Sequence, residues 1–162
     1  MNKLIPLVII IFIYPMLFAC ASTSAKKDIT TAPSFKFAEA TLTKRLYVKD
    51  TTAVPIEPTL TFSTEDSEAI SYVKLKNLAG EHKLRWDWIG PKGEIYLSSG
   101  DYTLSASKGK YREEVVAWHR LTIRGDRASH YPGEWQITVY LDGALIIQKG
   151  FLILDEKADE AH

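Results

Sequence analysis

Residues 132–143 read PGEWQITVYLDG, and this stretch decides the fold class. From Trp135 to Leu141, large apolar side chains occupy every second position. Successive side chains of a β-strand point to opposite faces, so one face carries Trp135, Ile137, Val139 and Leu141. The stretch therefore predicts a strand that buries one face in a core and presents Gln, Thr and Tyr side chains on the other.

Asp142-Gly143 ends this strand and predicts a two-residue turn of type I′, because both central positions of that turn need a positive φ. The turn leads directly into a second apolar strand, ALIIQKGFLIL at 144–154. It sets these cross-strand pairs: Leu141 with Ala144, Tyr140 with Leu145, and Thr138 with Ile147.

In this register the side chains of Tyr140, Leu145 and Ile147 gather on the outer face. An apolar cluster on a charged surface needs a cover, and we expect a partner protein to supply it. A three-residue loop would shift the second strand by one position and turn Leu145 and Ile147 inward. We favour the shorter turn, because the longer one asks Ala144 to take a left-handed conformation that suits glycine better.

The rest of the chain repeats this kind of pattern, and turn residues separate the segments. Strands at such spacing, without helices between them, predict a sandwich or a barrel. The alternation also places Trp86, Trp88 and Trp135 in the core. The predicted strands are SFKFAEATLTKRLYV (34–48), PTLTFST (58–64), AISYVKLKN (69–77), HKLRWDW (82–88), GEIYLSS (93–99), EEVVAWHRLTI (113–123), GEWQITVYL (133–141) and ALIIQKGFLIL (144–154).

PGEWQITVYLDG resembles the penultimate strand and hairpin of immunoglobulin-like and fibronectin-like modules, where a Pro-Gly start precedes an aromatic residue and alternating β-branched residues. The tryptophans of HKLRWDWIGPKG (82–93) stand where such folds often place a core aromatic on the third strand. The resemblance implies an all-β, immunoglobulin-like antiparallel β-sandwich of seven or eight strands. It concerns architecture alone, since this fold serves many functions. The cysteine pair of antibody-type domains is absent.

The first 19 residues, MNKLIPLVIIIFIYPMLFA, carry Lys3 as their one charge and are otherwise almost wholly apolar. A charged start followed by a short apolar run is the layout of a secretory signal peptide. The run is shorter than the roughly 20 residues of a membrane-spanning helix, and Pro6 and Pro15 interrupt it. A signal peptide is therefore the favoured interpretation.

Leu17-Phe18-Ala19-Cys20 resembles the bacterial lipobox, and Cys20 is the only cysteine of the chain. The resemblance implies cleavage before Cys20, a thioether to diacylglycerol, and acylation of the new amine by a fatty acid such as palmitate. Two or three acyl chains would anchor the protein to a membrane lastingly. Ala21 stands where an aspartate would signal inner-membrane retention, which implies the outer membrane. Ordinary signal cleavage after Ala21 is the alternative.

These features divide the chain into a signal peptide at 1–19, a lipidated N-terminus and flexible linker at 20–34, a β-sandwich at 35–154 and a charged tail at 155–162. The 20 basic and 20 acidic residues balance, so nothing indicates a nucleic-acid partner. The lipid membrane, bound through Cys20, is one expected partner, and an envelope protein is the other.

Motifs for catalysis and metal binding are missing. The histidines lack a second ligand at metal-site spacing. His82 and His119 fall on inner faces, where a backbone carbonyl is the expected partner of each. No G-x-S-x-G elbow and no glycine-rich phosphate loop occurs. We therefore expect no metal, no cofactor and no enzymatic activity.

Trp118 differs from the other tryptophans, because alternation places it on an outer face together with Arg120. An exposed tryptophan beside arginine is a candidate contact site for a protein. The sequence thus predicts a periplasm-facing lipoprotein of the outer membrane that acts as a protein-binding or structural module. A glycan-binding module and an envelope hydrolase with an unrecognised site remain as alternatives.

Overall fold

The computed structural model describes residues 36–50, 52–106 and 111–156, and these ranges form ten strands and one short 3₁₀ helix. The predicted signal peptide, Cys20 and the linker lie outside the described residues. No helix within the described ranges is long and apolar enough to cross a membrane. The elements are β1 (Lys36–Lys49), β2 (Thr52–Pro58), β3 (Thr61–Ser63), β4 (Glu68–Ala79), β5 (Glu81–Ile89), β6 (Ile95–Ser98), β7 (Tyr102–Ser105), β8 (Tyr111–Thr122), η1 (Arg127–His130), β9 (Gly133–Leu141) and β10 (Ala144–Leu154).

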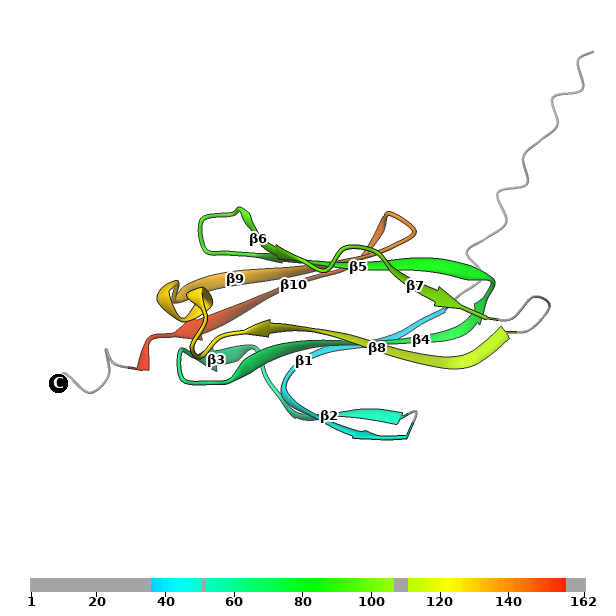
Figure 1. Ribbon diagram of the computed structural model, residues 1–162, viewed down its shortest axis with the longest axis horizontal. Coiled ribbons are helices and arrows are strands. Elements are labelled where there is room, and N and C mark those ends of the chain that lie inside the picture. Colours follow the sequence, from blue (N-terminus) through cyan, green and yellow to red (C-terminus); the bar gives the residue numbers. More distant parts are fainter. Residues whose placement is uncertain (1–35, 51, 107–110, 157–162) are drawn as a thin grey trace, which may run out of the picture. The chain divides into compact units, whose positions relative to one another are not determined.

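The strands form two layers that face each other (Figure 1). One sheet has the order β2-β1-β4-β8, and the other has the order β3-β10-β9-β5-β6, with β7 also paired to β5. The orders β1-β4-β8 and β10-β9-β5 match strands A-B-E and G-F-C of an immunoglobulin domain. The predicted all-β, immunoglobulin-like sandwich is confirmed. Its pairings are antiparallel except that between β3 and β10.

All eight predicted segments contain a strand, and the structure adds two that the sequence pattern missed. β2 carries Pro55 and Pro58, which are unusual within a strand except at a sheet edge. β7 has four residues in a serine-rich stretch and pairs with only part of β5. Both lie at sheet margins, where few side chains need to be buried, so the alternation that marks central strands is weak there.

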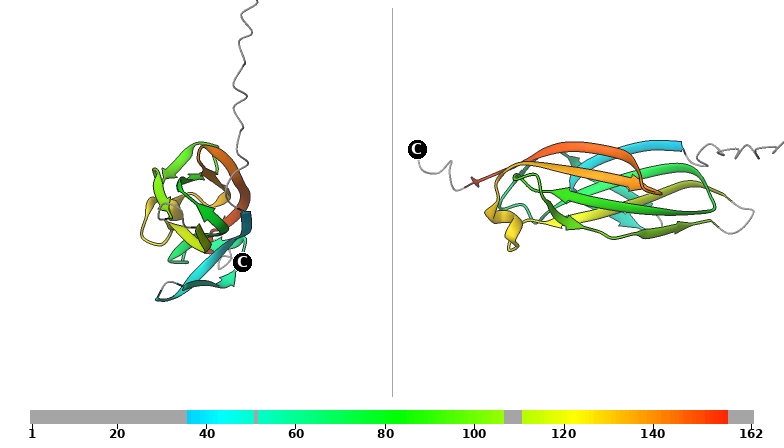
Figure 2. Two further views of the ribbon diagram at one scale, coloured as in Figure 1. Left: turned by 90° about the vertical axis from the view of Figure 1, so that its right-hand side faces the viewer. Right: turned by 90° about the horizontal axis from the view of Figure 1, so that it is seen from above.

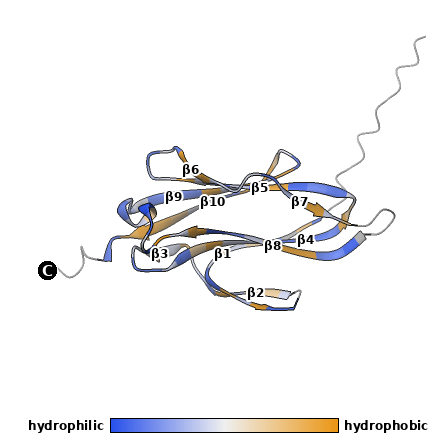
Figure 3. Cartoon of the chain, viewed as in Figure 1, coloured by the Kyte–Doolittle hydropathy of each residue, from blue (hydrophilic) through white to orange (hydrophobic). Residues whose placement is uncertain are grey.

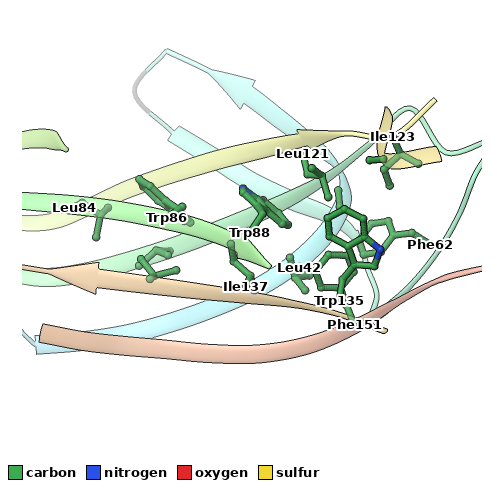
Figure 4. Packing of buried hydrophobic residues seen from close by; sticks show 14 of the residues in the cluster. Leu42, Phe62, Leu84, Trp86, Trp88, Leu121, Ile123, Trp135, Ile137 and Phe151 are labelled. Atoms are coloured by element: carbon green, nitrogen blue, oxygen red, sulfur yellow. The ribbon is translucent and has the colours of Figure 1, made fainter. Parts of the chain in front are cut away.

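The core lies between the sheets and is built around the three tryptophans predicted for it (Figure 4). Trp86, Trp88 and Trp135 are at most 2% exposed, so this prediction is confirmed. The ring of Phe151 lies edge-on to Trp88, with ring centres 5.8 Å apart, and 6.2 Å from the ring of Trp135. The Trp135 indole N–H donates to the carbonyl of Tyr131 at 2.9 Å, so this buried polar group has a partner.

A second, smaller buried group lies on the outer side of the first sheet. The β1–β2 hairpin projects to that side of the layers (Figures 1 and 2), and apolar residues occur on it as well as on the two sheets (Figure 3). Ala53 on the hairpin is buried, as are Ile70 and Tyr72 on β4, yet none of them belongs to the main core cluster. The hairpin therefore covers part of a face that would otherwise be exposed to solvent.

Candidate functional site

The β9–β10 hairpin has the predicted turn but not the predicted register beyond it. Asp142 and Gly143 have φ values of 52° and 79°, as a type I′ turn requires. The first two predicted pairs, Leu141 with Ala144 and Tyr140 with Leu145, are confirmed. A β-bulge between Leu145 and Ile147 then shifts the ladder by one residue.

The bulge overturns the predicted apolar cluster on the outer face. Ile147 lies opposite Val139 instead of Thr138, and it packs against the core. Leu145 is exposed beside Tyr140 on the outer face, where the guanidinium of Arg85 lies 4.5 Å from the centre of the Tyr140 ring. The prediction that Tyr140, Leu145 and Ile147 form one patch is therefore wrong.

The physical reason for the bulge lies further along β10. Phe151 must lie opposite Trp135 to reach the core, and it does so. A two-residue turn followed by an unbroken ladder would place Phe151 opposite Glu134, on the outer face. One extra residue in β10 reconciles the tight turn with the burial of Phe151.

Trp118 and Arg120 lie on β8, with their side chains on the predicted outer face. The opposite face of the strand is buried at Val115 and Leu121, which belong to the core cluster. Trp118 is half-buried, and Arg120 is exposed and forms an ion pair with Glu68 at 3.6 Å. The assignment of the two faces of β8 is confirmed.

β8 is an open edge of the first sheet, because among the described strands it pairs with β4 alone. The other margins of the two sheets are short or blocked, except that β10 has no described partner on its β3 side over 144–151, because β3 pairs with Leu152–Leu154 alone. β3 has three residues, β6 and β7 have four each, and β2 contains two prolines that lack a backbone N–H. β8 has 12 residues and no proline, so it offers the longest free edge of the described fold. A long free edge is a template for pairing with another strand.

Two hollows follow the β8 edge, one toward each end of the strand. The first has a volume of about 220 Å³ and is apolar in character, and the second has a volume of about 500 Å³. Strand β7 forms the far wall of the first, and β6 forms that of the second. The first is lined by Trp86, Tyr102, Thr103, Leu104, Ala117 and Trp118. The second includes Ile95, Tyr96, Leu97, Arg120, Leu121, Arg127 and Tyr131.

The second hollow has an ordered polar end. The Tyr96 hydroxyl donates to Asp126 Oδ1 at 3.2 Å, and Asp126 also caps η1 by accepting the N–H of Arg127. Burial, reinforced by the carboxylate of Asp126, raises the pKa of Tyr96, so this phenol stays protonated as a donor. Sequence reasoning missed Tyr96, Tyr131 and Arg127, because they come from separate segments that only the tertiary fold brings together.

The two inner-face histidines have structural partners. His82 bonds Asp142 Oδ2 at 2.6 Å and the Ala79 carbonyl at 3.0 Å, as a histidine with a carbonyl partner was predicted to do. His119 instead accepts the indole N–H of Trp88 at Nδ1, at 2.9 Å. Burial lowers the pKa of His119, so the neutral ring acts as the acceptor. The described residues hold no group of three or more His, Cys, Asp or Glu side chains placed to bind a metal.

Buried Asp87 also has partners within the fold, whereas the buried Nε of Arg85 and the buried indole N–H of Trp86 have no hydrogen-bond partner among the described residues. Asp87 is buried under the outer face of the second sheet, where it accepts the Ser98 hydroxyl at 2.6 Å and lies 3.3 Å from Arg85. A further hollow of about 550 Å³ opens near Gly90 and Gly150, with mainly apolar walls and no pair of titratable groups.

Comparisons with known proteins leave the family open. No family model matches this chain, and no curated protein sequence matches it. Solved structures that resemble it include an immunoglobulin-like protein from Pseudomonas aeruginosa, at 11% identity and a TM-score of 0.48, which covers 74% of this chain and 96% of that one. An alkylpurine DNA glycosylase from Pseudomonas fluorescens, bound to DNA with an abasic site analog, has 12% identity and a TM-score of 0.47. A β-glucosidase from Listeria innocua in complex with glucose has 13% identity and a TM-score of 0.43.

This chain spans 30% of the length of the glycosylase and 16% of that of the β-glucosidase. The match therefore concerns one part of each enzyme. The fold assignment rests on the strand order described above, and the site on β8 is described from its own geometry.

Proposed function

We propose that this protein is a lipid-anchored, non-enzymatic module of the bacterial cell envelope, held at the outer membrane through acylated Cys20 and facing the periplasm. The described domain binds another polypeptide or supports an assembly through the β8 edge. The resemblance of Leu17 to Cys20 to a lipobox supports the anchor. The geometry of β8 supports the binding role.

The observation that carries this proposal is a long, proline-free strand edge flanked by exposed aromatic and apolar side chains. An extended polypeptide that pairs with β8 would gain main-chain hydrogen bonds along the edge. Its side chains would meet Trp118 on one side and Tyr102 or Ile95 on the other. Tyr102 and Ile95 are 50% and 61% exposed, which is unusual for apolar residues beside a core and typical of a contact surface.

Protein binding is favoured over glycan binding, because a sugar ring needs an accessible aromatic platform. Trp86, Trp88 and Trp135 are buried and cannot stack on a ligand. Trp118 and the exposed Tyr47 and Tyr102 remain, and Trp118 lies at a strand edge whose free backbone groups suit a polypeptide.

Site-specific photocrosslinking in intact cells tests the proposal. A photoreactive phenylalanine analogue replaces Trp118 in the full-length protein, and a matched variant carries it at Leu145, which is exposed on the other sheet. We expect adducts from position 118 and few from position 145, with mass spectrometry naming the partner. Absence of adducts from position 118, in a variant that is folded and membrane-bound, would contradict the proposal.

A further inference from the structure

The residues of β8 that face its open edge follow from the ladder with β4. Ile123, just beyond the strand, donates its N–H to the carbonyl of Ser67 at 3.0 Å, in register with the β4–β8 ladder. In an antiparallel ladder, alternate residues direct their N–H and C=O groups to the same neighbour. The odd-numbered residues of β8 therefore bond β4. The even-numbered ones, among them Trp118 and Arg120, direct theirs to the open edge.

The side chains of these even-numbered residues have charges that match those of a second β8 strand running in the opposite direction. In chain order the outer-face residues are Glu114, Val116, Trp118 and Arg120. If a second β8 runs antiparallel beside the first with Ala117 opposite its own copy, Glu114 lies opposite Arg120 of the other copy. Val116 then lies opposite Trp118. Opposite charges and aromatic to β-branched contacts are the favourable cross-strand pairs.

We infer that the partner of β8 is a second copy of this chain, paired antiparallel about a two-fold axis at Ala117; this inference rests on the proposed function and specifies its partner. This register also lets the free backbone groups form hydrogen bonds. Residues that direct their N–H and C=O groups to the open edge lie opposite residues of the other copy that do the same. A two-fold axis makes every contact occur twice, as in most homodimers.

The surrounding charges extend the match across the neighbouring strands. Within one copy, Lys74 on β4 lies 3.4 Å from Glu114, and Glu68 on β4 lies 3.6 Å from Arg120. Across the paired copies the row would read Lys74, Glu114, then Arg120 and Glu68 of the second copy. The charges alternate in sign along the whole row, so Glu114 has a cation on both sides and Arg120 has a carboxylate on both sides.

Other registers lack this complementarity. An axis at Trp118 sets Glu114 opposite Thr122 and Arg120 opposite Val116, with no charge pair. An axis at Val116 sets Arg112 opposite Arg120, which is repulsive. The axis at Ala117 also places the smallest side chain of the strand at the point where the two copies face each other directly.

Cysteine crosslinking of the full-length protein in membranes tests the axis. Residues directly opposite at a non-hydrogen-bonded pair have Cα atoms about 4.5 Å apart, within the range that a disulfide bridges. Ala117→Cys should form a disulfide-linked dimer after mild oxidation. Glu113→Cys is the matched control, because its copy would lie eight positions away along the strand, about 27 Å at strand spacing. The parent protein, with Cys20 alone, sets the background.

Charge reversal in the Ala117→Cys background tests the register independently of folding. Glu114→Arg creates two Arg-Arg contacts in the dimer, and Arg120→Glu creates two Glu-Glu contacts. Each reversal should lower the yield of linked dimer about tenfold, the effect of roughly 1.4 kcal/mol. Mixing the two variants should restore it, because each Arg at 114 or 120 then faces a Glu. Restoration on mixing shows that both variants remain folded.

The outcomes separate this inference from the proposed function. Equal linking of Ala117→Cys and Glu113→Cys, or reversed variants that link as well as the parent pair, would overturn the two-fold pairing. If photocrosslinking at Trp118 then names a different protein, the proposed function stands and only the second copy is excluded. If Trp118 gives no adduct of any kind and Ala117→Cys does not link, both proposals fail.

Discussion

The β-bulge in β10 makes two neighbouring residues respond very differently to the same change. Ile147 packs against the core opposite Val139, whereas Leu145 is 51% exposed on the outer face. We expect Ile147→Lys to destabilise the domain strongly and Leu145→Lys to leave its stability almost unchanged. The simple two-residue hairpin predicts the same mild effect for both.

The magnitude follows from the position of each side chain. Full burial of an isoleucine side chain contributes about 1.5–3 kcal/mol, and the partly buried Ile147 forfeits about half of that. An ammonium group turned toward apolar surroundings adds about 1–3 kcal/mol. The loss of unfolding free energy is therefore about 2–4 kcal/mol for Ile147→Lys. A surface change such as Leu145→Lys stays within about 0.5 kcal/mol.

Denaturant unfolding of residues 36–162, followed by tryptophan fluorescence, measures both values in one assay. This segment holds the whole core cluster, and the buried tryptophans report its unfolding directly. Thermal melting should agree, with a decrease of about 10 °C for Ile147→Lys, since each kcal/mol shifts the Tm of a domain this size by roughly 3–6 °C. Equally small losses for the two variants would show that the bulge is absent and that Ile147 faces outward.

Three further predictions concern the core, pH and the anchor. Trp135→Ala should lower the unfolding free energy by about 3–5 kcal/mol, measured by the same unfolding assay, and an unchanged value would exclude Trp135 from the core. Burial lowers the pKa of folded His119 below its ordinary 6.5, so the unfolded chain takes up a proton first. The stabilising effect of neutral His119 is present above pH 6.5 and is lost as the pH falls from there toward the lowered pKa. His119→Gln should reduce this loss of stability. An identical pH dependence of the Tm in both proteins would refute the prediction. Cys20→Ser should release the domain from membranes upon cell fractionation, and a native mature chain that begins at Ser22 would show that no lipid is attached.

The core could be predicted from the sequence, because burial imposes a period of two on central strands. Trp86 and Trp88 lie two positions apart on β5, and both are buried. The same reasoning separated Trp118 from Leu121 on β8. Where a strand must bury one face, alternation predicts which side chains point inward.

The bulge could not be predicted from the turn alone, although the sequence contains a sign of it. Asp142-Gly143 favours a register in which Phe151 faces outward, whereas the apolar positions Phe151 and Ile153 need to face the core. This conflict marks an extra residue somewhere in the strand. It does not indicate where, since Ile146 and Ile147 are both apolar and suit either face.

The open edge was beyond sequence reasoning for another reason. The pattern of β8 gives the faces of the strand but not its neighbours in the sheet. Whether β8 has one neighbour or two depends on where β7 pairs, and β7 joins β5 in the other sheet. The walls of the second hollow likewise combine Tyr96 from β6 with Tyr131, which follows η1.

The prolines of β2 set a limit to how far this protein can associate. Two copies joined along β8 would merge their four-stranded sheets into one, and both outer margins of that sheet would be β2. Pro55 and Pro58 lie three positions apart, so one of them faces the free margin and leaves it without one of the N–H donors that a third copy would need. In such a pair both β8 edges would be occupied, and the proline at each β2 margin would disfavour the addition of a third copy there. On a membrane surface, where anchored chains meet often, such a built-in terminator would allow self-recognition without polymerisation.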